Sequence, residues 1–258
     1  MGTIETFTLP ISPLKQDPRR IWVYLPDSYA KTRKKYDILY MFDGHNLFSD
    51  ETATYGKSWG MKEYLDKTGI DLVVIGQDCS HVNENRMSEY CPYPPFEDPK
   101  RPFKMKGDGA FTAEWFAKVL KPECEKRYRI YKNREHVGIG GSSMGGLMAE
   151  YCVTAFNDVY SKAACISPAS YYCREALNQK IKETEFKKTR VYLDMGSEER
   201  SDKTETVWML AMMLETSHLF TEKGCVTWPH INVGAGHNEA SWEKIVPLMI
   251  EYLYPELY

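Results

Sequence analysis

The sequence lacks any long run of apolar residues, and over its 258 residues no stretch approaches the length of a membrane span. The first residues show no basic segment followed by an apolar one, so we expect no secretory signal. An excess of one charge is also missing, because 33 Lys and Arg nearly balance 36 Asp and Glu, for a net charge of -3. This balance gives no reason to expect nucleic acid or an anionic membrane as a partner.

Cysteine pairs are absent as well. None of the seven cysteines stands in a C-x-x-C motif, and an odd number cannot all be bridged within one chain. We therefore expect free thiols and a cytoplasmic protein. No Cys or His cluster has zinc-ligand spacing, and neither a complete P-loop nor a complete dinucleotide fingerprint occurs, so we expect no metal and no cofactor.

Short strand-like runs alternate with longer helical patterns, an order that predicts an α/β fold with a mostly parallel sheet covered by helices on both faces. The length fits a single domain over residues 1–258. The expected strands are 3–9, 19–25, 37–42, 71–76, 136–140, 162–167, 190–195 and 227–233. The expected helices are 59–67, 110–127, 146–156, 205–223 and 241–254.

Two stretches interrupt this alternation. Residues 79–107 contain five prolines among aromatic residues, and a connection of this length in a compact domain is usually functional or disordered. Its aromatic content argues against disorder. Because it follows the expected strand 71–76 at the edge where ligands bind in such sheets, we expect this insertion to cover the acyl or leaving-group side of a binding site. Residues 168–188 form a second insertion, for which we expect short helices.

Gly141, Ser143 and Gly145 have the Gly-x-Ser-x-Gly spacing of a nucleophile elbow, in which a serine stands on a sharp turn between a strand and a helix. The context agrees, because an expected strand precedes the motif and an expected helix follows it. So tight a turn leaves no room for a Cβ atom two residues before or after the serine. Ser143 is therefore the candidate nucleophile, and Ser142 fails the same spacing because Met144 occupies its second glycine position.

A serine nucleophile needs a base, an acid that orients the base, and two amides for the oxyanion. His237 follows the last expected strand and precedes the last expected helix, which is where an α/β-hydrolase places its base. The amide of Met144 is one oxyanion donor by its place in the motif. We assign the second to His45, in the loop after strand 37–42, with Asn46 as the neighbouring alternative.

The acid is expected in the loop after strand 190–195, because the chain order serine, acid, histidine is that of the α/β-hydrolase fold. Spacing alone does not choose among the carboxylates there. The candidates are Asp194, Glu198, Glu199 and Asp202.

Several segments together resemble the Putative esterase (esterase D-like) family of α/β-hydrolases. Residues 40–48 look like the oxyanion segment of this family, although Gln is commoner there at the place of His45. Residues 86–92 resemble its Arg-x-x-Glu-Tyr-x-Pro element, 140–147 its elbow, 193–199 the turn that supplies its acid, and 236–239 its histidine loop. The resemblance covers nearly the whole chain and implies the α/β-hydrolase fold, with Glu199 as the acid.

The resemblance further implies a serine carboxylic-ester hydrolase that acts through an acyl-enzyme on a small-molecule or oligosaccharide ester. The expected acyl group is feruloyl or acetyl on a carbohydrate, with aromatic residues as candidate walls of the pocket: Trp59, Tyr90, Tyr93, Phe96 and Trp242. The same aromatics are equally typical of a core. Alternatives are a siderophore-ester hydrolase, an acyl-thioester hydrolase of the S-formylglutathione type, an acyltransferase, or a non-catalytic carbohydrate-binding domain.

Overall fold

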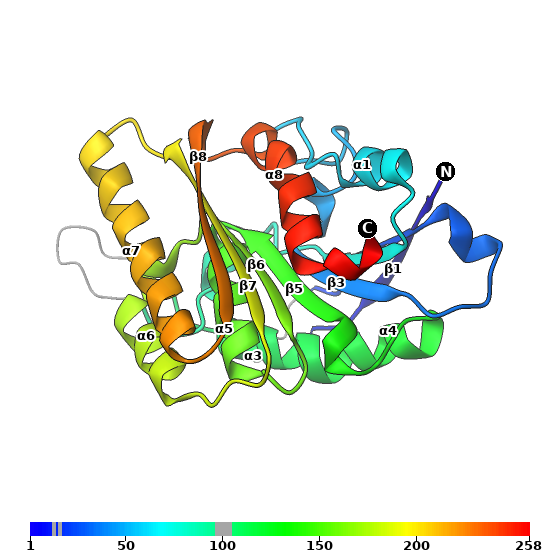
Figure 1. Cartoon of the computed structure of the whole chain (residues 1–258), viewed down its shortest axis with the longest axis horizontal. Helices are drawn as coiled ribbons and strands as arrows, with labels where there is room; N and C mark the ends of the chain where they lie inside the picture. Colours follow the sequence, from blue (N-terminus) through cyan, green and yellow to red (C-terminus); the bar gives the residue numbers. More distant parts are fainter. Residues whose placement is uncertain (12–13, 15–16, 96–104) are drawn as a thin grey trace.

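The structure is a computed structural model that describes residues 1–11, 14, 17–95 and 105–258 (Figure 1). Its centre is an eight-stranded sheet in the order β1-β2-β4-β3-β5-β6-β7-β8. β2 pairs antiparallel with β1 and with β4, whereas all other neighbours are parallel. The strands are β1 (Thr3–Leu9), β2 (Arg19–Leu25), β3 (Asp37–Phe42), β4 (Leu72–Gln77), β5 (Val137–Ser142), β6 (Lys162–Ile166), β7 (Arg190–Glu198) and β8 (Val226–Gly236).

Helices cover both faces of the sheet, as the alternation of elements predicts (Figure 1). One face packs against α1 (Met61–Thr68) and α8 (Glu239–Leu253). The other face packs against the remaining long helices. These are α3 (Gly109–Trp115), α4 (Lys121–Arg127), α5 (Met144–Ala155), α6 (Arg174–Glu183) and α7 (Lys203–Glu222). The short α2 (Asn85–Glu89) lies beyond the end of β4.

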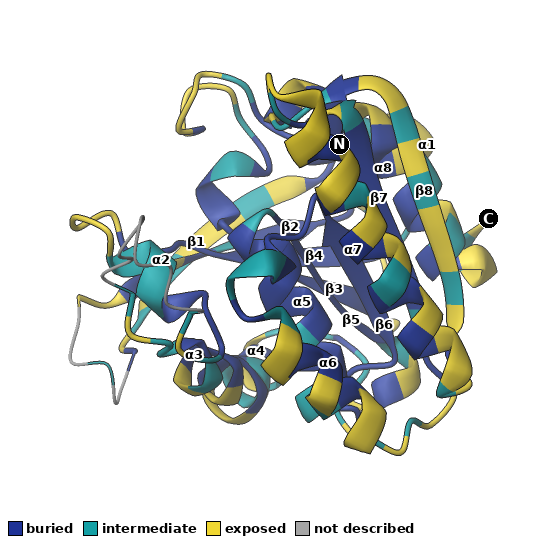
Figure 2. Ribbon diagram, turned by 90° about the vertical axis from the view of Figure 1, so that its left-hand side faces the viewer, coloured by how far each residue is buried: buried dark blue, intermediate teal, exposed yellow. Residues whose placement is uncertain are grey.

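The central strands are buried on both faces because their side chains alternate between the two helical layers. In β3, Ile38, Tyr40 and Phe42 join one core while Leu39 and Met41 join the other. Such a strand has no polar face, which explains its continuous apolar sequence. Along the edge strands β1 and β8, in contrast, exposed residues alternate with partly buried ones, as Figure 2 shows.

The predicted helices are confirmed, with starts that differ by one or two residues, and at α7 and α8 a side chain caps the observed start. Asp202 accepts a hydrogen bond from the Thr204 amide, so α7 begins at Lys203, two residues before the predicted start. Asn238 caps α8 in the same way through the Ser241 amide. The predicted helix 110–127 is one helical segment with a π turn, Phe116–Leu120. The π turn ends just before Pro122, which lacks the N–H that a regular α-helix needs.

The second insertion holds a 3₁₀ turn, Ser170–Tyr172, and α6, which confirms the short helices expected there. All seven cysteines are unpaired thiols. Within the residues that the structure describes, no helix is both long and apolar enough to cross a bilayer.

Strands β3 to β8 run in one direction, so their carboxyl ends share one edge of the sheet. The loops that leave this edge carry the chemically distinctive residues of the chain: His45 after β3, Cys79 and His81 after β4, Ser143 after β5, Ser167 after β6, Glu199 after β7 and His237 after β8. Ligands of open α/β sheets bind at this edge.

Candidate active site

Ser143 occupies the turn between β5 and α5 with φ 57° and ψ -119°, a conformation that a residue other than glycine rarely adopts. Backbone hydrogen bonds hold this turn, because the Ser143 amide donates to Ile166 O at 2.9 Å and its carbonyl accepts from Ala169 N at 3.0 Å. Backbone strain held in place in this way is typical of functional positions. The geometry is that of the nucleophile elbow predicted from the motif.

The two glycines of the motif are required by close contacts. A Cβ on Gly141 would lie 2.8 Å from the carbonyl carbon of Gly145, and a Cβ on Gly145 would lie 2.9 Å from Phe42 Cβ. Both positions are therefore too crowded for a larger residue, as the sequence predicts.

His237 follows β8, and its Nδ1 lies 2.5 Å from Oε2 of Glu199 in the loop after β7. The Glu199 side chain is fully buried, while the histidine is partly exposed. Ser143 and His237 line the same cavity. The structure thus brings together the serine, the histidine and the glutamate that the sequence analysis selected.

Glu199 is fixed by two further donors on its other oxygen, Oε1. The Ser167 hydroxyl donates to it at 2.6 Å and the Gly196 amide at 2.8 Å. Burial alone would raise the pKa of Glu199, but the hydrogen bond and charge of His237, with the bonds from Ser167 and Gly196, lower it overall. Glu199 is therefore held as a carboxylate next to the imidazole.

The three other carboxylates of this loop have different partners. Asp194 is buried on β7 beside His230 of β8, 2.5 Å away, and burial raises its pKa to about 6. Glu198 pairs with Lys203, and Asp202 caps α7. Each of the three is engaged away from His237.

The loop after β3 lines the cavity with Asp43, His45 and Asn46. The Asn46 amide donates to Asp43 O at 2.9 Å, whereas no backbone bond among the described residues uses the His45 amide. The Met144 amide opens α5, so it needs no partner within the helix. Of the three amides considered, those of Met144 and His45 thus have no backbone partner among the described residues, whereas that of the alternative, Asn46, is occupied.

An ion pair that the sequence analysis did not identify holds this loop. Asp43 has a positive φ of 56°, and Arg86 donates to its two carboxylate oxygens at 2.8 and 2.7 Å. Burial would raise the pKa of Asp43, but the charge and hydrogen bonds of Arg86 lower it overall. Glu89, from the same motif, pairs with Arg19 of β2 at 2.6 Å. The Arg-x-x-Glu element thus connects the loop after β3 with strand β2. The sequence shows that Arg86 and Glu89 are charged, but it does not show which residues they pair with.

The cavity has a volume of about 410 Å³, and most of the residues that line it carry polar side chains, among them Asn46, Asn83, Arg86 and Glu239. Of the aromatics expected in its walls, Trp242 lines it and lies 5.2 Å from the His237 ring.

Three of the other expected wall residues lie elsewhere. Trp59 is only 2% exposed and packs in the core against Trp242, and Tyr90 is fully buried, with its hydroxyl on Gln77. Tyr93 packs against Tyr151 at 5.5 Å instead of facing the cavity. Phe96 lies outside the described residues. Trp59 and Tyr90 occupy core positions, where burial of their large apolar area stabilises the fold.

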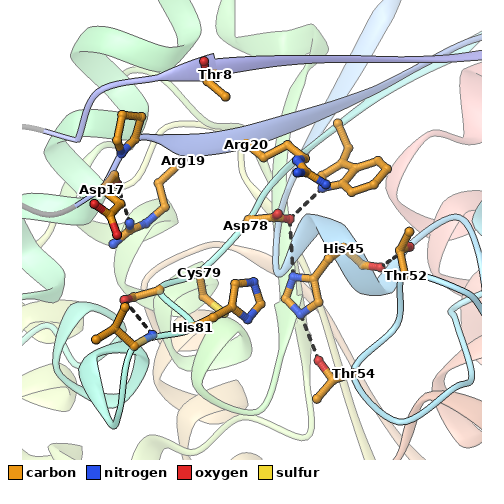
Figure 3. A pocket seen from close by; sticks show the side chains of 14 residues that line it. Thr8, Asp17, Arg19, Arg20, His45, Thr52, Thr54, Asp78, Cys79 and His81 are labelled. Carbon is orange, nitrogen blue, oxygen red and sulfur yellow. Dashed lines mark hydrogen bonds and ion pairs between the residues drawn. The ribbon is translucent and has the colours of Figure 1, made fainter.

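A second cavity, of about 600 Å³, adjoins the first (Figure 3). The two cavities share His45, Thr54, Cys79, Ser80 and His81. The His45 and His81 rings meet edge to face with centroids 4.7 Å apart. Partial burial, and then the neighbouring His45, lower the pKa of His81.

The chain is similar to several known proteins. The chain is 25% identical over 251 residues to the uncharacterized protein YbbA of Bacillus subtilis (strain 168), covering 95% of this chain and 96% of that one. An IroE-like serine hydrolase from Shewanella oneidensis superposes with a TM-score of 0.75 at 16% identity, over 100% of this chain and 80% of that one. The siderophore hydrolase EstB of Aspergillus nidulans gives 0.70 at 16% identity, over 97% and 95%.

These solved structures establish the fold, which is that of the α/β-hydrolases. Residues 12–251 match the model of the family described as "Putative esterase". The chain therefore belongs to the Putative esterase family and is an ester hydrolase.

Proposed function

We propose that the chain is a serine carboxylic-ester hydrolase whose nucleophile, base and acid are Ser143, His237 and Glu199. The observation that carries the proposal is the 2.5 Å contact between His237 Nδ1 and Glu199 Oε2, beside a cavity that also contains the strained Ser143. A carboxylate on Nδ1 fixes the tautomer in which Nε2 accepts a proton.

In the acylation step, His237 Nε2 takes the proton of the Ser143 hydroxyl while Oγ forms a bond to the ester carbon. The carbonyl oxygen becomes an oxyanion, and the amides of Met144 and His45 donate to it. Glu199 stabilises the imidazolium without accepting its proton. When the intermediate collapses, the C–O bond to the leaving alcohol breaks and the alcohol takes the proton from His237.

The second half of the reaction uses the same groups. His237 Nε2 takes a proton from water, and the water oxygen attacks the acyl carbon on Ser143. Collapse of this intermediate releases the acid and returns the proton to Ser143. No further protein group is required to balance the protons.

We infer a small acyl group, such as acetyl, on a carbohydrate or similar polyol. Asn46, Asn83, Arg86 and Glu239 offer the cavity the hydrogen-bond donors and acceptors that hydroxyl groups need. Trp242 and the exposed Tyr55 are the aromatics among the described wall residues, which favours acetyl over feruloyl. Unpaired thiols in all seven cysteines support the proposal of a reducing, cytoplasmic setting.

The test is a comparison of kcat/KM on an acetylated oligosaccharide, a feruloylated sugar, a cyclic triester siderophore and S-formylglutathione. We expect the acetylated sugar to be the best substrate and all turnover to disappear in Ser143→Ala. The neighbouring Ser142→Ala serves as the matched control and should lose far less activity. A higher kcat/KM on the siderophore or the thioester would replace the carbohydrate assignment, and no turnover of any ester would favour a binding protein.

A further inference from the structure

Three side chains able to bind a metal meet in the wall between the two cavities. They are His45 from the loop after β3 and Cys79 and His81 from the loop after β4, and Figure 3 shows them side by side. One donor atom from each residue lies within 4.8 Å of the others. Because they come from different loops, their spacing in the sequence does not resemble a zinc motif.

The His45 ring has an unsatisfied position in this wall. Its Nε2 is 3.0 Å from the Thr54 hydroxyl, but its Nδ1 is buried without a hydrogen bond. The carboxylate oxygen Oδ1 of Asp78 lies 3.4 Å from Nδ1, and the His45 side chain is only 8% exposed. A buried imidazole nitrogen without a hydrogen bond is costly, and a cation between it and a carboxylate would remove that cost.

The second cavity gives an ion a route to this cluster. All three residues line it, together with Asp78, and His81 is exposed at its wall. An ion that enters the cavity would meet His81 first, and then the buried Cys79 and His45.

We propose that His45, Cys79 and His81 bind one divalent transition-metal ion of the Zn²⁺ class, with Asp78 beside the His45 ligand. Nitrogen and sulfur donors select Zn²⁺ or similar ions over Mg²⁺ and Ca²⁺, which require oxygen ligands. Ordinary Zn–N and Zn–S bond lengths place tetrahedral donors about 3.3 to 3.6 Å apart. The donor atoms of the three residues lie within 4.8 Å of one another, so modest side-chain rotations bring them to bonding distance of one ion. On binding, the Cys79 thiol releases its proton to solvent and the thiolate bonds to the metal.

The position of the site gives the bound ion a consequence for activity. Its ligand His45 carries one of the proposed oxyanion amides, and His45, Cys79 and His81 all line the catalytic cavity. A metal that draws these three side chains together would displace the His45 amide and narrow the cavity. Bound metal therefore inhibits the esterase reversibly. This inhibition rests on the proposed function, but the binding of the metal does not depend on it.

Binding is tested without any activity measurement, using Co²⁺ as a spectroscopic probe and Zn²⁺ in calorimetric titrations of the full chain. We expect one ion per chain and a thiolate-to-Co²⁺ charge-transfer band. Cys79→Ser should abolish the band, and His81→Gln should weaken Zn²⁺ binding about tenfold or more. Cys225→Ser and His218→Gln, a buried thiol and an exposed histidine outside the cluster, should bind as the unmodified chain does.

No saturable binding, or equal binding by Cys79→Ser and His81→Gln, would overturn the site. Because His81 is exposed, His81→Gln remains informative even if Cys79→Ser fails to fold. The second measurement is hydrolysis of a chromogenic acetate ester with added Zn²⁺ and then a chelator. We expect Zn²⁺ to inhibit hydrolysis and the chelator to restore it. In His81→Gln, the same Zn²⁺ concentration should lower the rate by a smaller fraction of that variant's own metal-free rate. Binding at this site without inhibition would overturn the inhibitory role and leave the metal site standing.

Discussion

Ser167 donates its hydroxyl to Oε1 of Glu199 at 2.6 Å, on the side of the carboxylate opposite His237. Its own oxygen accepts a hydrogen bond from Trp242 Nε1 at 3.1 Å. Ser167 holds this place with a positive φ of 42°, which is rare for a residue other than glycine. A serine maintained in an unfavourable conformation beside the proposed acid indicates a role in positioning Glu199.

Removing the Ser167 hydroxyl should therefore lower kcat by about 10- to 100-fold, the equivalent of one hydrogen bond to a charged group. With one donor fewer, the Glu199–His237 pair binds a proton more tightly, so the acid limb of the kcat/KM profile should move to higher pH. Ser167→Ala and Ser167→Gly should behave alike, since glycine tolerates the positive φ and both lack the hydroxyl. If only Ala impairs the enzyme, backbone strain and not the hydroxyl is responsible.

The acid itself can be identified by four single amide replacements: Glu199→Gln, Glu198→Gln, Asp194→Asn and Asp202→Asn. We expect a large loss of kcat, on the order of 10⁴-fold, only for Glu199→Gln, because this carboxylate alone contacts His237. Asp202→Asn retains a capping side chain and should change little. A dominant loss in Asp194→Asn would transfer the role to the Asp194–His230 pair.

The Asp43–Arg86 pair should support both stability and activity. Arg86→Met leaves the Asp43 carboxylate buried without its partner, and because Arg86 is 28% exposed we expect a loss of about 1–3 kcal/mol in urea unfolding. The double variant Asp43→Asn with Arg86→Met should recover part of this loss. kcat should fall in Arg86→Met because the His45 amide follows Asp43 in the loop. A loss in the double variant equal to the sum of the losses in Arg86→Met and Asp43→Asn alone would contradict a direct coupling.

Glu150, on the helix after the nucleophile, predicts a dependence of stability on pH. Burial raises its pKa to about 8, against an ordinary value of 4.5, and its Oε1 has no hydrogen bond. Between these values the folded chain keeps a proton that the unfolded chain loses, so the free energy of unfolding falls as pH rises from about 5 to 8. Glu150→Gln should remove this contribution and gain on the order of 1–4 kcal/mol relative to the unmodified chain at pH 8, and little at pH 5. Parallel stability curves, as expected for the exposed Glu251→Gln control, would contradict the assignment.

The sequence predicts those features that depend on local pattern. Strand β3 was recognised because five apolar residues follow Asp37, and it occupies the predicted range. The elbow at Ser143 was recognised because a tight turn excludes Cβ atoms at positions 141 and 145. His237 follows from chain order, since parallel strands deliver their following loops to one edge of the sheet.

Contacts between loops could not be predicted in the same way. Only the resemblance favours Glu199 over its neighbours, because three other carboxylates lie within five residues of it in the chain. Ser167 and Asp43 have partners 32 and 43 residues away, and nothing local indicates such pairings. Trp59 and Tyr90 are core residues and not pocket walls, a distinction that the sequence does not make because large aromatics are typical of both places.

The central claim is that Ser143 is the nucleophile of this esterase, and covalent labelling tests it most directly. The chain is treated with a fluorophosphonate, and the modified residue is located by peptide mass spectrometry. We predict one label per chain, on Ser143, and no label in Ser143→Ala, whose kcat should fall by a factor on the order of 10⁴ to 10⁶. A label on another residue, or ester hydrolysis that persists in Ser143→Ala, would contradict the assignment.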